Sequence, residues 1–322
     1  MDLECHRVEL TGYCYRMLAS GFEAEDAVQE TFLRAWRRAD GFDVAKGSLR
    51  TWLYAIATNV CVDMLRSPQR RALSVGPPSE PGSPLGAPLP DTAWVWPVPD
   101  WKVLDPADAV VNKESVRLAF VAALQHLSPR QRAVLILRDV LCWRAAEVAL
   151  LLDTSPHAVN SVLQRARAVL PVHQSVASRD LVVADEEQVV LNKDQVVSSR
   201  DQRVLDRYCA AFEAHDVDAL VALLHEDATM AMPPFAFWMR GRAHLEVALR
   251  HATACKDAHL VQVTANGGPA FAHYAPDGTP FALITVELAD GLITGTTSHL
   301  DPRLFGLFDL PMSFPAALRT HG

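Results

Sequence analysis

One stretch near the middle of the chain, residues 127–170, limits the fold more than any other, because three helices joined by two tight turns can be read from it. Ser128 followed by Pro129 is typical of a helix N-terminus, and an apolar stripe continues from there. A second helix is expected at about 143–152. A polar turn then leads into a third helix, at about 156–170, which begins with a Ser-Pro pair. The stretch therefore predicts a compact group of three short helices.

The third of these helices has one apolar face, because its aliphatic residues recur at helical spacing. This face consists of Val159, Val162, Leu163, Ala166 and Leu170. The other faces, together with the capping residue, carry the polar and basic residues Ser155, His157, Asn160, Ser161, Gln164, Arg165 and Arg167. A short helix, a tight turn and a polar second helix are typical of a helix-turn-helix, and Asn, Gln and Arg side chains read base edges or bind phosphates. The alternative is a small helical bundle with a solvated polar face.

Length and composition restrict the rest of the chain. Its 322 residues are enough for two or three domains, and half of them are hydrophobic, so each domain can have a core. The net charge of −8 argues against nucleic-acid binding over the whole surface but allows a local basic face. The six cysteines form no CxxC pair, so we expect no metal, no disulfide and no cofactor. The charged N-terminus and the lack of a long apolar run predict a cytoplasmic protein with no membrane contact.

Residues 3–71 are expected to be helical, because no proline interrupts them before Pro68. Leu33 lies among charged residues on the second helix, as in a helix that docks on a partner, although single exposed leucines are common. The third helix, about 48–66, has Trp52 on its apolar face, and its other faces carry Arg50, Tyr54, Thr58, Asn59, Asp63 and Arg66. Such residues suit single-stranded nucleic acid, in which bases stack and phosphates need a countercharge. The alternative is a three-helix bundle with an ordinary charged surface.

Two segments resemble a known family. The segment AEDAVQETFLRAWRRADGFD (24–43), followed by GSLRTWLYAIATNVCVDMLR (47–66), resembles region 2 of sigma-70-type factors of the extracytoplasmic-function (ECF) group. The helix-turn-helix stretch 127–170 resembles region 4 of the same group. The two modules occur in the family's order. The resemblance implies a promoter-specificity subunit that binds core RNA polymerase, through its β′ and β subunits, and promoter DNA.

The resemblance also implies roles for particular positions. The helix that docks on the β′ clamp helices would present Asp26, Gln29, Glu30, Phe32 and Leu33. The −10 element would be melted and read by the 40–47 loop and by Trp52, Tyr54, Asn59, Asp63 and Arg66. Trp52 is equally suited to the core, because its spacing places it on the buried face. The −35 element would be bound by Ser155 and the polar residues of the last helix. Cys142 stands where the family commonly has a small, glycine-like residue.

Residues 72–106 form a linker rich in proline and glycine, which favour an extended chain. Trp94, Trp96 and Trp101 are unusual in such a segment and are expected to pack on other parts of the protein. The linker resembles that of sigma factors with a C-terminal SnoaL-like domain, which implies contact of the tryptophans with that domain. The alternative is packing against the region 4 helices. A second connector, 173–200, is expected to be irregular or helical.

Residues 201–318 predict an α+β domain in which helices precede an antiparallel sheet. Strands are expected at 260–265, 270–274, 281–288 and 292–299. The segments DVDALVALLHEDATMAMPP and TSHLDPRLF resemble the SnoaL-like group, which implies a cone-shaped sheet around a pocket for a small-molecule ligand. The pocket or an interdomain face would be lined by Phe235, Phe237 and Trp238. No diagnostic spacing occurs among the acid–base candidates His225, Asp227, His273, Glu287 and His299.

The fold class is therefore multidomain, with two all-α modules at residues 1–71 and 107–172 followed by the α+β domain. We expect a sigma factor, not an enzyme, whose C-terminal domain modulates transcription initiation. The alternative is a helix-turn-helix regulator tethered to a cyclase- or isomerase-like enzyme domain. A third hypothesis, a one-component repressor with a ligand sensor, leaves residues 24–66 without a role.

Overall fold

The computed structural model describes residues 2–39, 42–43, 47–66, 77–104, 113–170, 198–252 and 256–314. The chain divides into two compact units. The first unit comprises residues 1–72 and 92–180, and the second comprises residues 73–91 and 181–322. The division inside the linker falls between Asp91 and Thr92, within a short 3-10 helix at Asp91–Ala93. The linker therefore belongs in part to each unit.

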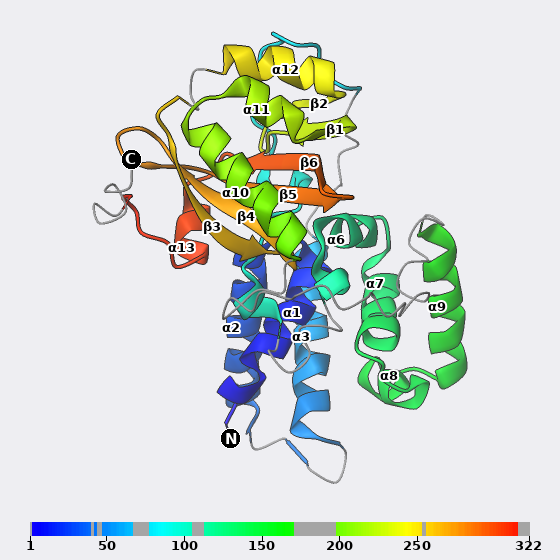
Figure 1. The fold of residues 1–322 in the computed structure, drawn as a ribbon. Coiled ribbons are helices and arrows are strands. Elements are labelled where there is room, and N and C mark those ends of the chain that lie inside the picture. Colours follow the sequence, from blue (N-terminus) through cyan, green and yellow to red (C-terminus); the bar gives the residue numbers. More distant parts are fainter. Residues whose placement is uncertain are drawn as a thin grey trace. The chain divides into compact units, whose positions relative to one another are not determined.

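Three helices form the N-terminal part of the first unit (Figure 1). After a 3-10 turn at Glu4–His6 they are α1 (Arg7–Leu18), α2 (Gly21–Arg37) and α3 (Leu49–Leu65). Ser20 and Ser48 cap α2 and α3, because each hydroxyl accepts a hydrogen bond from a backbone N–H three residues further on. Every residue of α1 from Leu10 to Leu18 is buried. The first helix is thus a central helix of this unit.

The second half of the linker packs on α1. The Trp96 backbone N–H donates to a carbonyl just after α1 over 2.9 Å, and the Tyr15 hydroxyl donates to the Trp96 carbonyl over 3.0 Å. The short helix α4 (Asp100–Val103) follows and also contacts α1. A Cβ atom at Gly12 would lie only 2.6 Å from the carbonyl oxygen of Val103. Gly12 therefore permits the close approach of this linker segment to α1.

The rest of the first unit is the predicted helix-turn-helix region with the helices that precede it. These elements are a 3-10 helix (Lys113–Val116), α6 (Leu118–Leu124), α7 (Pro129–Leu135), a π-helical turn (Ile136–Val140), α8 (Ala145–Leu151) and α9 (Pro156–Val169). Ser128 and Gln131 form a capping box at the start of α7. The three predicted helices are confirmed as α7, α8 and α9.

One hydrophobic core runs through α1–α3 and α6–α9. Arg132 of α7 is buried within it, and its guanidinium donates to the Met17 carbonyl of α1 and to the Gln125 side chain. A carbonyl in the last turn of a helix carries partial negative charge, which offsets part of the cost of burying this cation. The two modules predicted from the sequence are therefore joined in one compact unit.

The second unit is an α+β domain with a mixed six-stranded sheet (Figure 1). Its helices are α10 (Ser199–Glu213), α11 (Val217–Ala222), α12 (Arg242–His251) and α13 (Arg303–Leu307). Its strands are β1 (Leu224–Ala231), β2 (Trp238–Arg240), β3 (His259–Ala265), β4 (Gly268–Tyr274), β5 (Pro280–Ala289) and β6 (Leu292–His299). The strand order is β2-β1-β6-β5-β4-β3, and only β1 and β6 run parallel.

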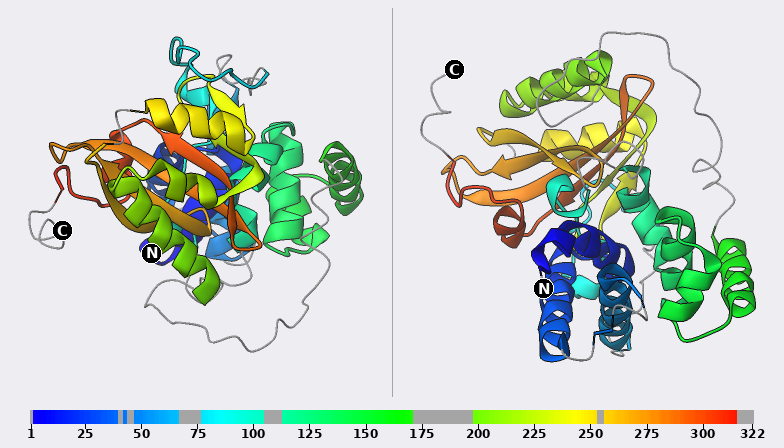
Figure 2. Two further views of the ribbon diagram at one scale, coloured as in Figure 1. Left: turned by 45° about the horizontal axis from the view of Figure 1, so that its top comes forward. Right: turned by 90° about the horizontal axis from the view of Figure 1, so that it is seen from below.

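Helices cover both faces of this sheet (Figure 2). On one face the rings of Tyr208 and Phe212, from α10, contact Phe271 and His273 of β4 at centroid distances of 5.4 and 5.2 Å. On the other face Tyr274 contacts a phenylalanine ring of α13. The four predicted strands are confirmed as β3–β6, whereas β1 and β2 are absent from the prediction. Residues 173–197 of the second connector lie outside the described residues.

The first half of the linker packs on this second unit. Backbone N–H groups of Ser79 and Leu89 donate to carbonyl oxygens of Trp238 and Pro234 over 2.7 and 2.8 Å. The carboxylate of Asp91 pairs with Arg303 of α13 at 2.8 Å. Residues 79–91 are thus attached along the edge of the C-terminal domain. None of the helices in the described parts of the chain is long and apolar enough to cross a membrane.

Candidate nucleic-acid interface

Helix α9 presents most of the residues that we predicted for the −35 site to solvent. Ser155 caps the helix, accepting a hydrogen bond from the Ala158 backbone N–H over 3.2 Å. The opposite side of α9 is fixed by three buried residues, Val159, Leu163 and Ala166. As a result, the other predicted contact residues of α9 are exposed or half-buried. They are His157, Asn160, Ser161, Gln164, Arg165 and Arg167. The stretch 127–170 contains six arginines and three acidic residues, a local excess of positive charge in a chain of net charge −8.

The two arginines of α9 differ in their partners. Arg167 forms a bidentate ion pair with Asp139, with N–O distances of 2.9 and 2.6 Å. This pairing raises the pKa of Arg167 and holds its guanidinium on one flank of the helix. Arg165 has no ion pair or side-chain hydrogen bond with any described residue. Arg165 is therefore the arginine of α9 whose charge is available to a ligand.

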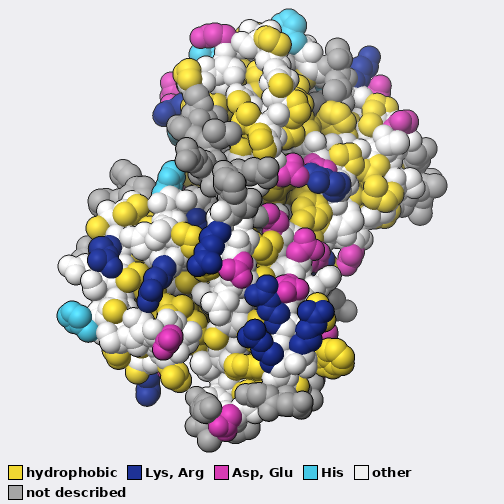
Figure 3. Space-filling view, turned by 180° about the vertical axis from the view of Figure 1, so that it is seen from behind, with side chains coloured by type: hydrophobic (Ala, Val, Ile, Leu, Met, Phe, Trp, Pro, Cys, Tyr) yellow, Lys and Arg dark blue, Asp and Glu magenta, His cyan; other side chains and the backbone are white. Residues whose placement is uncertain are grey.

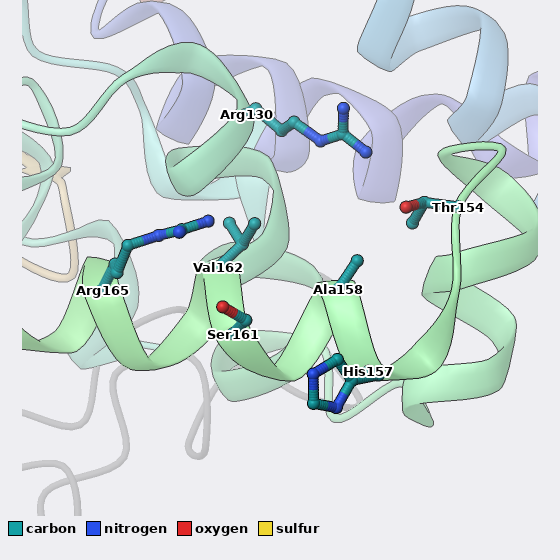
Figure 4. Close-up of a pocket in the computed structure, with 7 residues that line it drawn as sticks. All are labelled: Arg130, Thr154, His157, Ala158, Ser161, Val162 and Arg165. Atoms are coloured by element: carbon teal, nitrogen blue, oxygen red, sulfur yellow. The ribbon is translucent and has the colours of Figure 1, made fainter.

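A groove of about 440 Å³ lies beside α9 (Figure 4). It is lined by Arg130, Thr154, His157, Ala158, Ser161, Val162 and Arg165. Arg130 comes from the first turn of α7, and Arg165 extends toward the same space from α9. Arg130 could not be predicted as a lining residue from the sequence, because helical periodicity within α9 gives no information about a neighbouring helix. On the face of the molecule in Figure 3, basic side chains gather over the helices of the first unit.

Helix α2 carries the predicted polymerase-docking residues on one face. Asp26, Gln29 and Leu33 are exposed. The other two predicted residues have partners within the unit, because Glu30 pairs with Arg34 at 2.6 Å and the ring of Phe32 lies under the guanidinium of Arg7.

The same face of α2 also carries Trp36, which our sequence analysis did not single out. With a relative exposure of 74%, it is the most exposed large apolar side chain of the described residues. A position three residues after Leu33 on a helix lies on the same side, so this signal was present in the sequence. A tryptophan left in water beside Leu33 marks an apolar contact surface.

Helix α3 exposes some of the residues predicted for the −10 element. Asn59, Asp63 and Arg66 are exposed, and Asp63 pairs with Arg66 at 3.4 Å. Trp52 is half-buried, and its ring lies on that of Phe42 at a centroid distance of 5.2 Å. Trp52 thus contributes to the core and also contacts the described part of the 40–47 loop.

The expectation that Tyr54 and Thr58 lie on the accessible side of this helix is wrong. Both are buried, because the hydroxyl of Thr58 bonds that of Tyr13 of α1 and the Tyr54 ring packs on Tyr13. On its other side Tyr54 meets the indole of Trp143, just before α8, at a centroid distance of 4.9 Å. The guanidinium of Arg50 lies over the same indole at 5.2 Å. Burial raises the pKa of the Tyr54 hydroxyl well above its usual value.

The residues predicted to line a pocket or an interdomain face lie in both units. Phe237 is buried, and Phe235 and Trp238 are half-buried. The backbone of Phe235 and Trp238 pairs with the backbone of the linker segment 79–91. Trp94 and Trp96 belong instead to the first unit, where the backbone of Trp96 binds α1. Linker residues before the tryptophans therefore contact the C-terminal domain.

The acid–base candidates of this domain do not form one site. His225, Asp227 and Glu287 are exposed, and burial lowers the pKa of His273 to about 4. Burial likewise lowers the pKa of His299 to about 3. The register pairs Ala272 with Leu283 and Leu283 with His299, so His273 and His299 point to opposite faces of the sheet. Among the described residues no group of three or more His, Cys, Asp or Glu side chains could hold a metal ion.

Three family descriptions match successive parts of the chain. The family descriptions of Sigma-70 region 2, Sigma-70 region 4 and the SnoaL-like domain match residues 3–71, 117–170 and 205–307. The ECF RNA polymerase sigma factor SigG of Mycobacterium tuberculosis (strain CDC 1551) is 45% identical over 323 residues, covering 96% of this chain and 83% of SigG. The ECF sigma factor SigJ of M. tuberculosis (strain H37Rv) is 31% identical over 228 residues, covering 71% of this chain and 62% of SigJ.

A solved structure extends the likeness to the fold. The crystal structure of SigJ from M. tuberculosis aligns with a TM-score of 0.58 and 22% identity, covering 96% of this chain and 98% of that one. At this identity the structural match supports the fold alone. The family follows from the sequence relatives and the family descriptions: the chain belongs to the ECF sigma factors of RNA polymerase, in the form that carries a C-terminal SnoaL-like domain.

Proposed function

We propose that this chain binds core RNA polymerase and directs it to promoters, and that three surfaces of its first unit carry this function. The exposed face of α2, with Leu33 and Trp36, docks on the polymerase. The exposed end of α3 and the loop before it capture the −10 element. Helix α9 enters the major groove at the −35 element. The proposal depends most on the orientation of α9. Its polar and basic residues face solvent, while Val159, Leu163 and Ala166 are buried on the opposite side.

We further propose that the described form of the first unit is closed to promoters. Helix α3 contacts Trp143, beside the helix-turn-helix, through Tyr54 at 4.9 Å. The −10 and −35 elements are about 25 base pairs apart, which is roughly 85 Å at 3.4 Å per base pair. A helix the length of α9 covers only about 21 Å at 1.5 Å per residue. The two DNA-binding helices must therefore separate before both elements are bound, and the polymerase surface is what separates them.

The contacts of the SnoaL-like domain with the linker support a role of this domain in modulating transcription initiation. The domain binds the linker backbone at Ser79 and Leu89 and the carboxylate of Asp91. Five residues further along, Trp96 binds α1 of the first unit. A ligand or partner that changed the contacts of the domain with residues 79–91 would therefore affect a linker that is also bound to α1. We infer no catalytic role, because no two of the candidate acids and bases share a buried site.

The polymerase-docking surface can be tested by equilibrium binding of the full-length chain to core RNA polymerase. Leu33→Asp places a charge at the centre of the exposed apolar face of α2, so we expect affinity to fall at least about tenfold. Val247→Asp is the matched control, since Val247 is an exposed apolar residue of α12 in the other unit. Equal affinities of the Leu33 variant and the wild type would contradict this assignment of α2.

A further inference from the structure

The arginines of the helix-turn-helix region differ sharply in how they are used. Four of them have partners: Arg117 pairs with Glu114, Arg132 and Arg138 donate to backbone carbonyls, and Arg167 pairs with Asp139. Arg130, Arg144 and Arg165 form no ion pair with any described residue, and two of these three, Arg130 and Arg165, line the groove beside α9. Two unpaired cations at one concave surface create a local positive potential with no internal countercharge.

The chemistry of the groove favours an anion with several oxygen atoms. Besides the two guanidinium groups, the lining includes the hydroxyl groups of Thr154 and Ser161 and the imidazole of His157. Guanidinium and hydroxyl groups are the usual protein donors to phosphate oxygens. Two apolar residues, Ala158 and Val162, form the rest of the lining on α9. A phosphate would therefore find donors on both sides and no competing carboxylate among the lining residues.

The position of Arg130 shows which part of DNA it can reach. Gln164 lies opposite the buried side of α9 and outside the lining of this groove, so it points to the floor of the major groove. A helix with its side chains is about 10–12 Å wide, and the major groove is about 12 Å wide, so α9 fills it. Arg130 comes from a neighbouring helix at the flank of α9. A side chain in that position faces the sugar–phosphate wall of the groove rather than a base edge.

We propose that Arg130, together with Arg165, binds a backbone phosphate at the edge of the −35 element. This inference rests on the proposed function, in which α9 enters the major groove there. It extends the interface from the recognition helix to α7, and it assigns Arg130 to affinity and register rather than to sequence discrimination. Since α7 packs directly against α9, the phosphate contact would also fix the angle at which α9 lies in the groove.

The test is binding of holoenzyme, formed from core polymerase and the full-length chain, to a promoter duplex selected from random fragments. Loss of one phosphate contact reduces the slope of log affinity against log salt by about 0.9. We therefore expect the affinity advantage of wild type over Arg130→Ala to shrink by about 3.5-fold between roughly 50 and 200 mM salt. Arg130→Lys keeps a positive charge and should retain most of the slope, since phosphate accepts a point charge. Arg117→Ala, outside the groove, is the control for loss of one charge.

Methylphosphonate substitution of single phosphates locates the contact. One substitution beside the −35 element should weaken binding by the wild type but not by Arg130→Ala, because the two changes remove the same interaction. An unchanged salt slope in Arg130→Ala, or an altered base preference at the −35 element, would overturn the proposal. Gln164→Ala distinguishes a failure of the Arg130 phosphate contact from a failure of the placement of α9 in the major groove. If it relaxes base preference while Arg130→Ala has no effect, only this inference fails; if neither variant has any effect, the placement of α9 fails as well.

Discussion

At the scale of single residues, Cys142 carries a backbone strain that the sequence comparison alone would not reveal. Its φ angle is +55°, in the left-handed region, and it joins the π-helical turn after α7 to α8. For a residue with a Cβ atom this conformation costs roughly 1–2 kcal/mol. The thiol contributes little stabilisation to offset this cost, because it is exposed and its distance to the Val140 carbonyl oxygen is 4.0 Å. A glycine at this position would carry no such cost.

We expect Cys142→Gly to stabilise the helix-turn-helix region. Removal of the Cβ relieves the left-handed strain, and the extra entropy of glycine in the unfolded chain offsets part of it, leaving a gain of about 0.5–1 kcal/mol. The urea midpoint of pulse proteolysis within residues 129–169 measures this change. Cys142→Ala serves as the control, since it removes the thiol but keeps the Cβ. A gain in the alanine variant equal to that in the glycine variant would show that backbone strain is not the cause.

Residue roles on a single helix could be predicted from the sequence, and roles that depend on contacts between helices could not. The spacing of Val159, Leu163 and Ala166 fixes which side of α9 is free, so its candidate contacts are mostly exposed as predicted. Tyr54 was placed wrongly because α3 is covered on two sides, by α1 and by Trp143, which widens its buried face beyond one apolar stripe. Arg130 joins the groove only through the packing of α7 on α9.

At the scale of secondary-structure elements, the contact of α3 with the segment before α8 must break for the proposed opening of the first unit. The Trp143 indole is buried against Tyr54 and Arg50. Loss of a buried tryptophan costs roughly 3–5 kcal/mol. If even half of that cost falls on the closed form alone, the ratio of open to closed molecules rises by about tenfold or more, since each 1.4 kcal/mol is a factor of ten.

We expect Trp143→Ala to shift the first unit toward an open form. Fluorescent labels on noncanonical residues at Asn59, exposed on α3, and Leu150, exposed on α8, would report a longer distance in this variant than in the wild type. Trp143→Phe keeps an aromatic ring against Tyr54 and should give a distance close to that of the wild type. Identical distance distributions in the wild type and Trp143→Ala would mean that this contact does not hold the unit closed.

Elements with strong periodicity or clear turns were predictable, and elements defined by pairing across the sheet were not. Strands β3–β6 alternate with Gly- and Asp-containing turns and follow one another as hairpins. Strand β1 has three exposed positions near its start and pairs in parallel with β6, which lies more than sixty residues away in the chain. Parallel pairing of distant segments leaves no local turn signal in the sequence.

At the scale of the whole molecule, each half of the linker makes contacts within its own unit: residues 79–91 with the SnoaL-like domain and Trp96 with α1. Arg303 of α13 binds both Asp91 of the linker and Asp301 at the end of β6. These ion pairs raise the pKa of Arg303, so the guanidinium stays charged at any physiological pH. The division of the linker between the two units was not predictable from its composition, because proline and glycine content predicts an extended chain but not what that chain contacts.

The central claim is that this chain gives core RNA polymerase its promoter specificity. Its most direct test is run-off transcription with core polymerase and the full-length chain on a promoter selected from genomic fragments. We predict a transcript of defined length with the wild type, no transcript with Leu33→Asp, and a strongly reduced one with Arg165→Ala. A transcript of equal yield from core polymerase alone, or from the Leu33 variant, would contradict the account. Specific DNA binding without polymerase, and no transcript from any variant, would favour a one-component repressor instead.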